Sequence, residues 1–250
     1  MPAPSGGGIE GGRDERASPE RTLDAASRRL GYDFSHNLRY EAIRRHVIAF
    51  GLRRLLVLGC GRGVLESVLP AGIETVSVDI ARERLEIARA LNAGSSSRRF
   101  VELDLMQAAD TLGRGAFDGV ILSEVIEHLA HDVAALAVGR DCLAPRGILI
   151  VTVPNTDRLV NAVRRRLGLH PRFMGRTHLR EYTRESLHRA LGTAGFEILS
   201  TEMVALCLPK ESLVQRLQLL APRHPLRTWM LRRWPHLGTY LLALARANPG

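Results

Sequence analysis

The amino-acid sequence predicts an α/β fold: a doubly wound, mostly parallel, seven-stranded sheet with a helical insert near the C-terminus. Three observations support this prediction. Short apolar runs alternate with segments of helical periodicity, which is typical of a doubly wound sheet. The first apolar run leads directly into a cluster of glycines. The 250 residues are 45% apolar and 24% charged, which is ordinary for a chain that buries its own hydrophobic core.

Each strand is predicted from a short apolar or alternating run, and each helix from apolar residues three or four positions apart. The expected strands are 55–58, 76–80, 100–105, 119–122, 148–153, 197–204 and 239–245. The expected helices are 37–50, 64–69, 81–88, 133–143 and 184–194. In the third helix Ala81, Leu85 and Ala88 share one face. Thr183 is the expected N-cap of the last helix, which ends at Gly195.

Charge and cysteine content narrow the functional classes only partly. The chain carries 35 Lys and Arg against 26 Asp and Glu, a net charge of +9, and Lys210 is its only lysine. This basicity is compatible with nucleic acid, an anionic membrane or an anionic substrate. Three cysteines far apart predict neither a disulfide framework nor a cysteine zinc site, and indicate a reducing cytoplasm. No run approaches the ~20 apolar residues of a membrane span.

The most informative local pattern is Gly59-Cys60-Gly61-Arg62-Gly63, between the first strand and the first following helix. Glycines there allow a sharp turn and the close approach of a ligand to the backbone. Asp79 ends the next strand, where a carboxylate can accept hydrogen bonds from both hydroxyls of a ribose. A dinucleotide site would have its third glycine at position 64, which is Val64, so a nicotinamide oxidoreductase is disfavoured.

Over roughly residues 37–204 the sequence resembles the class I S-adenosylmethionine-dependent methyltransferases. The matching segments are 55–63, Asp79, Val101-Glu102-Leu103-Asp104-Leu105, Phe117-Asp118-Gly119-Val120-Ile121-Leu122 and Leu143-Ala144-Pro145-Arg146-Gly147. The resemblance implies the Rossmann-like fold of that family, S-adenosylmethionine as cofactor, Asp79 on its ribose and Asp104 near its adenine amino group. The implied cofactor-binding residues are Gly59, Cys60, Gly61, Gly63, Asp79, Ile80, Asp104, Leu105 and Ser123.

Ser123-Glu124-Val125-Ile126-Glu127-His128-Leu129 follows the fourth strand. On a helical turn Glu124, Glu127 and His128 would share one face, and could bind a divalent cation or move a proton. The segment resembles one in quinone-ring O-methyltransferases of ubiquinone biosynthesis. It also resembles one in small-RNA 3′-terminal 2′-O-methyltransferases, where Glu, Glu, His and a later His hold a metal; the later residue here would be His178.

Several roles for this segment stay open: lining of the pocket without metal, a divalent metal site, His128 as general base, or a structural role. His128 and Glu127 are the expected catalytic residues. The expected substrate-binding residues are Glu124, Asn155, His178 and Arg180. Arginines between 158 and 180 form a cluster over the expected acceptor site or a solvated face. Arg39 and Tyr40 are expected on a helix surface, with contact to the cofactor carboxylate as the alternative.

The expected organisation has four parts: 1–30 as a disordered lead-in, 31–204 as the S-adenosylmethionine-binding methyltransferase domain, 205–236 as a basic helical insert, and 237–250 as final strand and tail. Residues 205–250 hold seven basic residues and one acid, and so carry +6 of the total charge. In the insert, Leu213, Val214, Leu217 and Leu220 form one apolar stripe and Leu226, Trp229 and Met230 another. These stripes would pack on the sheet, close the substrate pocket or lie on an anionic membrane surface.

The expected function is methyl transfer from S-adenosylmethionine to a small-molecule or lipid-like acceptor, at oxygen. One alternative is an RNA 3′-terminal 2′-O-methyltransferase, although no RNA-binding module is evident. Another is a non-catalytic S-adenosylmethionine-binding partner protein, because Val57 stands where the family often has an acid. The expected location is the cytoplasm, with peripheral membrane contact through 205–236 as an alternative.

Overall fold

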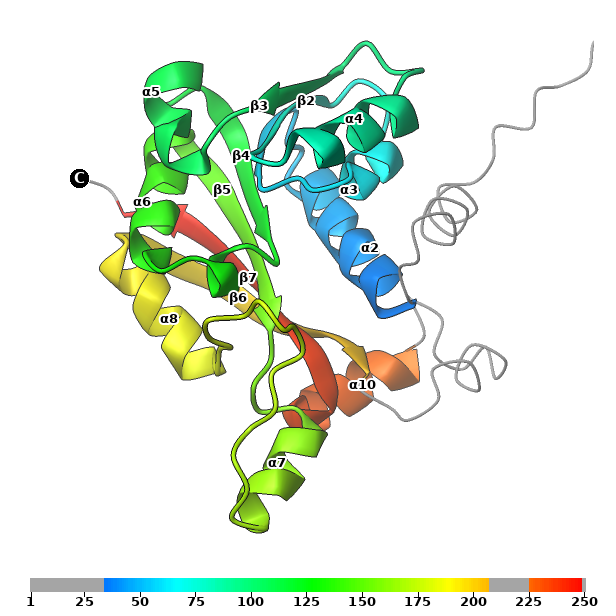
Figure 1. Ribbon diagram of the computed structural model, residues 1–250, viewed down its shortest axis with the longest axis vertical. Coiled ribbons are helices and arrows are strands. Elements are labelled where there is room, and N and C mark those ends of the chain that lie inside the picture. Colours follow the sequence, from blue (N-terminus) through cyan, green and yellow to red (C-terminus); the bar gives the residue numbers. More distant parts are fainter. Residues whose placement is uncertain (1–33, 207–224, 249–250) are drawn as a thin grey trace, which may run out of the picture.

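The computed structural model describes residues 34–206 and 225–248, which form one seven-stranded sheet with helices on both faces (Figure 1). The strands are β1 (Arg54–Leu58), β2 (Glu74–Asp79), β3 (Arg98–Glu102), β4 (Phe117–Ser123), β5 (Leu143–Pro154), β6 (Phe196–Leu206) and β7 (Gly238–Ala247). Their order is β3-β2-β1-β4-β5-β7-β6. Strand β7 runs antiparallel to the other six, which all point in one direction. The doubly wound, mostly parallel sheet predicted from the sequence is confirmed.

The described helices cover both faces of this sheet. They are α2 (Phe34–Ala49), α3 (Val64–Val68), α4 (Arg82–Leu91), α5 (Ala108–Leu112), α6 (Asp132–Cys142), α7 (Leu159–Arg166), α8 (Arg184–Thr193) and α10 (Pro225–Arg233). Figure 1 shows α2, α3 and α4 on one face and α5, α6 and α8 on the other. None of them is both long enough and apolar enough to pass through a bilayer.

Two hydrophobic cores follow from the alternation of side chains along the strands. In β1, Leu55 and Val57 pack with the core under α2 and α3, whereas Leu56 and Leu58 pack with the core under α6 and α8. A strand buried on both faces reads as a continuous apolar run, which is why β1 was recognisable from the sequence.

The topology brings four chain segments to one edge of the sheet. Strand β1 pairs in parallel with both β2 and β4, so the strand order reverses between β1 and β4. Ligands of doubly wound sheets bind beyond the carboxyl ends of the strands at such a point. The glycine loop follows β1, Asp79 ends β2, the segment 123–129 follows β4, and Asn155 follows β5.

Some boundaries differ from those predicted, for local reasons. Strand β3 ends at Glu102 rather than residue 105, because the Asp104 side chain accepts from the Met106 N–H (2.9 Å) and begins a 3₁₀ turn. Helices α5 and α7 were not predicted. The expected N-cap is confirmed: Thr183 and Ser186 form a capping box at the start of α8.

The basic segment near the C-terminus is described only in part. The lead-in 1–30 and the first apolar stripe of the insert lie outside the described residues. In α10 the expected stripe is wrong in its register: Trp229 is 55% exposed, whereas its neighbour Leu231 is buried.

Candidate functional site

The glycine loop after β1 leaves its backbone open at one position and is tightly packed at two. A Cβ on Gly59 would lie 2.7 Å from Val125 Cγ2, and one on Gly63 would lie 2.7 Å from Ala88 Cβ. A Cβ on Gly61, where φ is +57°, would meet nothing within 4 Å. Glycine is therefore required sterically at the two ends of the loop, while its middle faces open space into which a ligand can approach.

Asp79 ties this loop to the end of β2. Its carboxylate accepts hydrogen bonds from the backbone N–H groups of Gly61 and Ala81, both at 2.9 Å. The N–H groups of Gly59 and Cys60 donate to the Val78 carbonyl at 2.8 and 2.9 Å. Both carboxylate oxygens keep lone pairs for further donors such as ribose hydroxyls.

The other sequence-predicted cofactor residues lie at or directly after the carboxyl ends of β2, β3 and β4. Ile80 is 74% exposed directly beside Asp79. Asp104 and Leu105 begin the turn after β3, and the Ser123 hydroxyl lies 2.9 Å from that of Thr152. Burial raises the pKa of the Cys60 thiol, which favours the neutral thiol over the thiolate. An open glycine loop beside a carboxylate fits an adenosine cofactor.

The segment after β4 does not form the predicted helical face, and that prediction is wrong. Only Ile126–His128 forms a 3₁₀ turn, while Glu124 lies before it with φ +58°, in the left-handed region. A non-glycine residue there is strained, and such strain is common at functional sites. The turn nevertheless brings two of the three side chains together with a distant histidine.

Glu127, His128 and His178 each offer one ligand atom within 4.8 Å of the others. The rings of His128 and His178 meet edge to face, with centroids 4.8 Å apart. Glu127 is fully buried, and neither of its carboxyl oxygens has a hydrogen-bond partner among the described residues. A buried, unpartnered carboxyl is costly and indicates an additional ligand, a cation or a proton.

Burial and crowding of acids keep this cluster from being fully ionised. Burial, with a contribution from Glu124, raises the pKa of Glu127 to about 9. Burial also raises the pKa of Glu124 to about 7, although the nearby Arg39 opposes the shift. Near neutral pH Glu127 therefore carries a proton in the absence of a cation.

Arg39 is the main residue whose position the sequence did not predict. It is buried, not on the helix surface, with Nη1 3.5 Å from Glu124 Oε2. Its guanidinium lies 5.0 Å from the ring centroids of both Tyr40 and Tyr240, and Tyr40 is also buried. Burial opposes its charge, but Glu124 and the tyrosines raise the pKa of Arg39. Its Nε and Nη1 atoms lack hydrogen-bond acceptors among the described residues.

Glu181 and Arg158 lie behind His178 and hold its ring in place. His178 Nδ1 lies 3.3 Å from Glu181 Oε1, and Glu181 is bound in turn by Arg158. Both Arg158 and Glu181 are buried. The Leu179 N–H donates to the Glu127 carbonyl at 2.9 Å, which fixes this segment over the 3₁₀ turn. Glu181 was missed in the sequence; its position three residues after His178 was the available signal.

Asn155 and Arg180, which were expected to bind substrate, form hydrogen bonds and an ion pair within the protein instead. The Asn155 amide donates to the Gly238 carbonyl at 2.8 Å and is fully buried, so it joins β5 to the start of β7. Arg180 donates to the carbonyls of Leu129 and Ala130 and forms an ion pair with Asp132 at 2.9 Å. Of the four residues predicted to bind substrate, Glu124 and His178 lie with the cluster around Glu127.

Sequence comparisons relate this chain to known methyltransferases. A family model described as a methyltransferase domain matches residues 17–201. The chain is 33% identical over 139 residues to a ubiquinone biosynthesis O-methyltransferase of Ruegeria pomeroyi, covering 54% of this chain and 52% of that protein. It is 30% identical over 121 residues to one from Nitrosococcus oceani, covering 47% and 50%. The chain thus spans about half the length of these curated relatives.

Solved structures show the same fold at low identity. A methyltransferase from Archaeoglobus fulgidus superposes with a TM-score of 0.61 at 19% identity, covering 89% of this chain and 98% of that one. Magnesium protoporphyrin IX methyltransferase from Synechocystis, solved with bound S-adenosylhomocysteine, gives 0.58 at 19% identity, covering 85% and 84%. The family match, the strand order and the glycine loop together show that this chain belongs to the class I S-adenosylmethionine-dependent methyltransferases.

Proposed function

We propose that this methyltransferase acts on a hydroxyl oxygen of a small-molecule or lipid-like acceptor. One observation carries the proposal: Glu127, His128 and His178 converge at the same edge of the sheet as the glycine loop. A hydroxyl nucleophile must lose a proton, and these groups can take or stabilise it. Relatives whose names include an O-methyltransferase activity match about half of this chain, which supports the proposal.

The cofactor would lie in the cradle between β1, β2 and β4. We assign the residues around Gly61 and Asp79 to its methionine and ribose parts, and Ile80 and Leu105 to the faces of its adenine. When bound, S-adenosylmethionine supplies an electrophilic methyl group. The protein contributes alignment and exclusion of water, because the transfer is an in-line displacement in which charge becomes dispersed.

His128 is the proposed base. Its Nδ1 lies 3.2 Å from the Thr177 carbonyl oxygen, which can only accept, so we assign the ring proton to Nδ1. Nε2 is then free to accept the proton of the acceptor hydroxyl as the oxygen–methyl bond forms and the methyl–sulfur bond breaks. Glu127 Oε1 lies 4.0 Å from Nε2, and its protonated carboxyl can donate a hydrogen bond to the acceptor.

A second candidate uses a divalent cation on Glu127, His128 and His178. The unpartnered oxygens of Glu127 and the contact of His178 with Glu181 favour it, since metal-bound histidines are often oriented by a carboxylate. The cation would lower the pKa of the acceptor hydroxyl in place of His128. The RNA 3′-end alternative depends on this version, although Glu124 is not among the three clustered ligands.

Cofactor binding can be tested with S-adenosylhomocysteine and two matched variants. Asp79→Asn removes a carboxylate charge at the proposed ribose site, and Asp110→Asn removes one from an exposed position on α5. We expect calorimetry to show binding weakened about ten- to a hundredfold in the first variant, as for the loss of a charge-assisted hydrogen bond, and unchanged in the second. Equal affinities in all three proteins would contradict the assignment of Asp79.

Acceptor chemistry can be tested by transfer of labelled methyl into organic-extractable and RNA fractions of a bacterial lysate. We expect label in the organic fraction, lost in His128→Ala and retained in His131→Ala, which removes an exposed histidine nearby. Exhaustive chelation separates the two mechanisms, because only the metal version loses activity. Turnover unaffected by His128→Ala would exclude both, and label confined to RNA would overturn the proposed acceptor class.

A further inference from the structure

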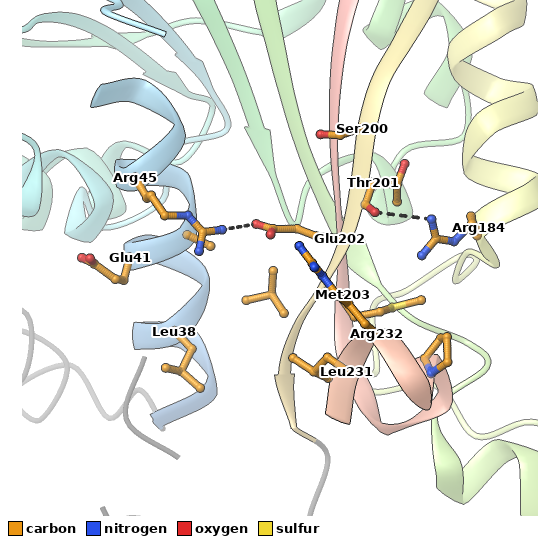
Figure 2. Close-up of a pocket in the computed structure, with 13 residues that line it drawn as sticks. Leu38, Glu41, Arg45, Arg184, Ser200, Thr201, Glu202, Met203, Leu231 and Arg232 are labelled. Carbon is orange, nitrogen blue, oxygen red and sulfur yellow. Dashed lines mark hydrogen bonds and ion pairs between the residues drawn. The ribbon is translucent and has the colours of Figure 1, made fainter. Parts of the chain in front are cut away.

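A cavity of about 440 Å³ lies between α2, β6 and α10, among residues that the proposed methyl-transfer mechanism does not use (Figure 2). Its volume is within the range of small-molecule sites. Helix α2 forms one wall and the edge strand β6 the other, while α10 and the turn after it close one end. Its lining includes Leu38, Ala42, Arg184, Glu202, Leu231 and Arg232.

Part of this cavity is apolar. Leu38 and Ala42 from α2, Val204 from β6 and Leu231 from α10 are all buried, although each contributes to the lining. They come from three elements far apart in the sequence. An apolar surface of this kind stabilises a hydrocarbon group by removing it from water.

The two acids of the lining are already matched by cations. Glu202 accepts from Arg45 at 2.5 Å and lies 2.9 Å from His46 Nε2, as the dashed line to Arg45 in Figure 2 shows in part. Burial opposes its ionisation, but the contacts with His46 and Arg45 lower the pKa of Glu202. Glu41 forms an ion pair with Arg44 at 3.4 Å. Both acids therefore already have a cationic partner apart from the remaining two arginines of the lining.

Arg184 and Arg232 are those remaining arginines. Arg184 donates to the Thr201 carbonyl at 3.3 Å, and Figure 2 shows the Arg232 side chain extending toward Glu202. Neither forms an ion pair with an acid among residues 34–206 and 225–248. The lining holds three arginines against two acids, and an excess of guanidinium charge beside an apolar surface attracts an anion that also has an apolar part.

We propose that this cavity binds a phosphate monoester with a short apolar body, a role separate from methyl transfer. A phosphate monoester carries about two negative charges near neutral pH, which match the two guanidinium groups. The apolar body would lie against Leu38, Ala42 and Leu231. Addition of a peptide strand to the free edge of β6 is disfavoured, because Arg184 already occupies the Thr201 carbonyl on that edge.

The test is calorimetric titration of the full chain with octyl phosphate below its micelle concentration. We expect saturable binding to one site, weakened at least tenfold in the double variant Arg184→Ala/Arg232→Ala. The control is Arg189→Ala/Arg233→Ala, which removes the same charge from exposed positions on the same two helices and leaves binding unchanged. Octanol and inorganic phosphate alone should each bind at least tenfold more weakly than octyl phosphate.

Three results would overturn the proposal: no saturable binding to the unmodified chain, equal weakening in both double variants, or octanol binding as tightly as octyl phosphate. The second would show general attraction to a basic surface. If the first double variant does not fold, Arg232→Ala alone serves, since this side chain is exposed. Binding of S-adenosylhomocysteine should be equal in all variants, so failure here is distinguishable from failure of the proposed function.

Discussion

Glu66 is an ionisable side chain placed in a hydrophobic core. It lies in α3, almost completely buried, and the Ser77 hydroxyl donates to its Oε1 at 2.6 Å. Its Oε2 has no hydrogen-bond partner among the described residues. Burial raises the pKa of Glu66 to about 7, although the Ser77 hydrogen bond and Arg98 oppose the shift. The folded chain therefore binds this proton more tightly than the unfolded chain does.

This difference predicts a pH-dependent free energy of unfolding. Between the usual pKa near 4.5 and the folded value near 7, the folded state retains a proton that the unfolded state loses, so stability falls as pH rises. Above pH 7 the Glu66 carboxyl is ionised in both states, so the free energy of unfolding does not fall further because of this group. Glu66→Gln keeps an acceptor for Ser77 and removes the titration, so between pH 5 and 8 it should gain on the order of 1–3 kcal/mol relative to the unmodified chain.

Urea unfolding of both proteins at pH 5, 6, 7 and 8 measures this change. Parallel stability curves across the range would mean that the Glu66 carboxyl ionises in the folded state as easily as in the unfolded one. Glu74→Gln is a suitable control, because it removes a carboxylate from an exposed position at the start of β2.

The loop from Met174 to Glu181 sets the position of the His178 side chain. The Gly175 N–H donates to His178 Nδ1 at 3.3 Å, and a Cβ on Gly175 would overlap the His178 ring. Glu181 Oε1 also lies 3.3 Å from this same ring nitrogen. Because the loop is at the surface, displacement of this ring should affect the site far more than the core.

Gly175→Ala should therefore lower turnover about ten- to a hundredfold through misplacement of His178. The affinity for S-adenosylhomocysteine and the midpoint of thermal unfolding should stay close to those of the unmodified chain. Gly94→Ala is the matched control, since a Cβ there meets nothing within 4 Å and its φ is not in the left-handed range. Unchanged turnover in Gly175→Ala would show that His178 does not take part.

The strands and helices differ in how well they could be predicted from the sequence. The central strands β1, β4 and β5 were predictable because burial on both faces makes each a local apolar run, and the loops at their carboxyl ends then follow from the topology. Helix α2 was predicted as an element, but the sequence did not show which face it buries: Ile43 and Val47 are fully buried, whereas Phe50 is exposed. Its buried face is set by α3 and β6, which local periodicity does not reveal.

The cluster around Glu127 was predictable in composition but not in geometry. Glu124 has its left-handed backbone at the end of β4, where its carboxyl meets Arg39 of α2. The contact of Arg158 with Glu181 joins two segments on either side of an irregular loop. Such pairs depend on how distant elements meet, so spacing within one segment could not identify them.

At the scale of the whole molecule, the sheet is completed by the last strand in the chain. Strand β7 lies between β5 and β6 and pairs with both, and its residues 240–245 are all buried. It contributes to both hydrophobic cores, since Leu241 packs with one and Leu242 with the other. Without β7, the edges of β5 and β6 would be unpaired, and apolar side chains on both faces would lose their neighbours.

Removal of β7 should therefore unfold the entire domain, including the cofactor loop that lies several strands away. A chain that ends at Leu237 should lose its cooperative thermal transition and any stabilisation by S-adenosylhomocysteine, whereas a chain that ends at Asn248 should keep both. Circular dichroism with and without the ligand measures the two outcomes. If the shorter chain still unfolded cooperatively and were stabilised by the ligand, β1, β2 and β4 would form the cofactor site on their own, and the antiparallel strand would serve only the acceptor side.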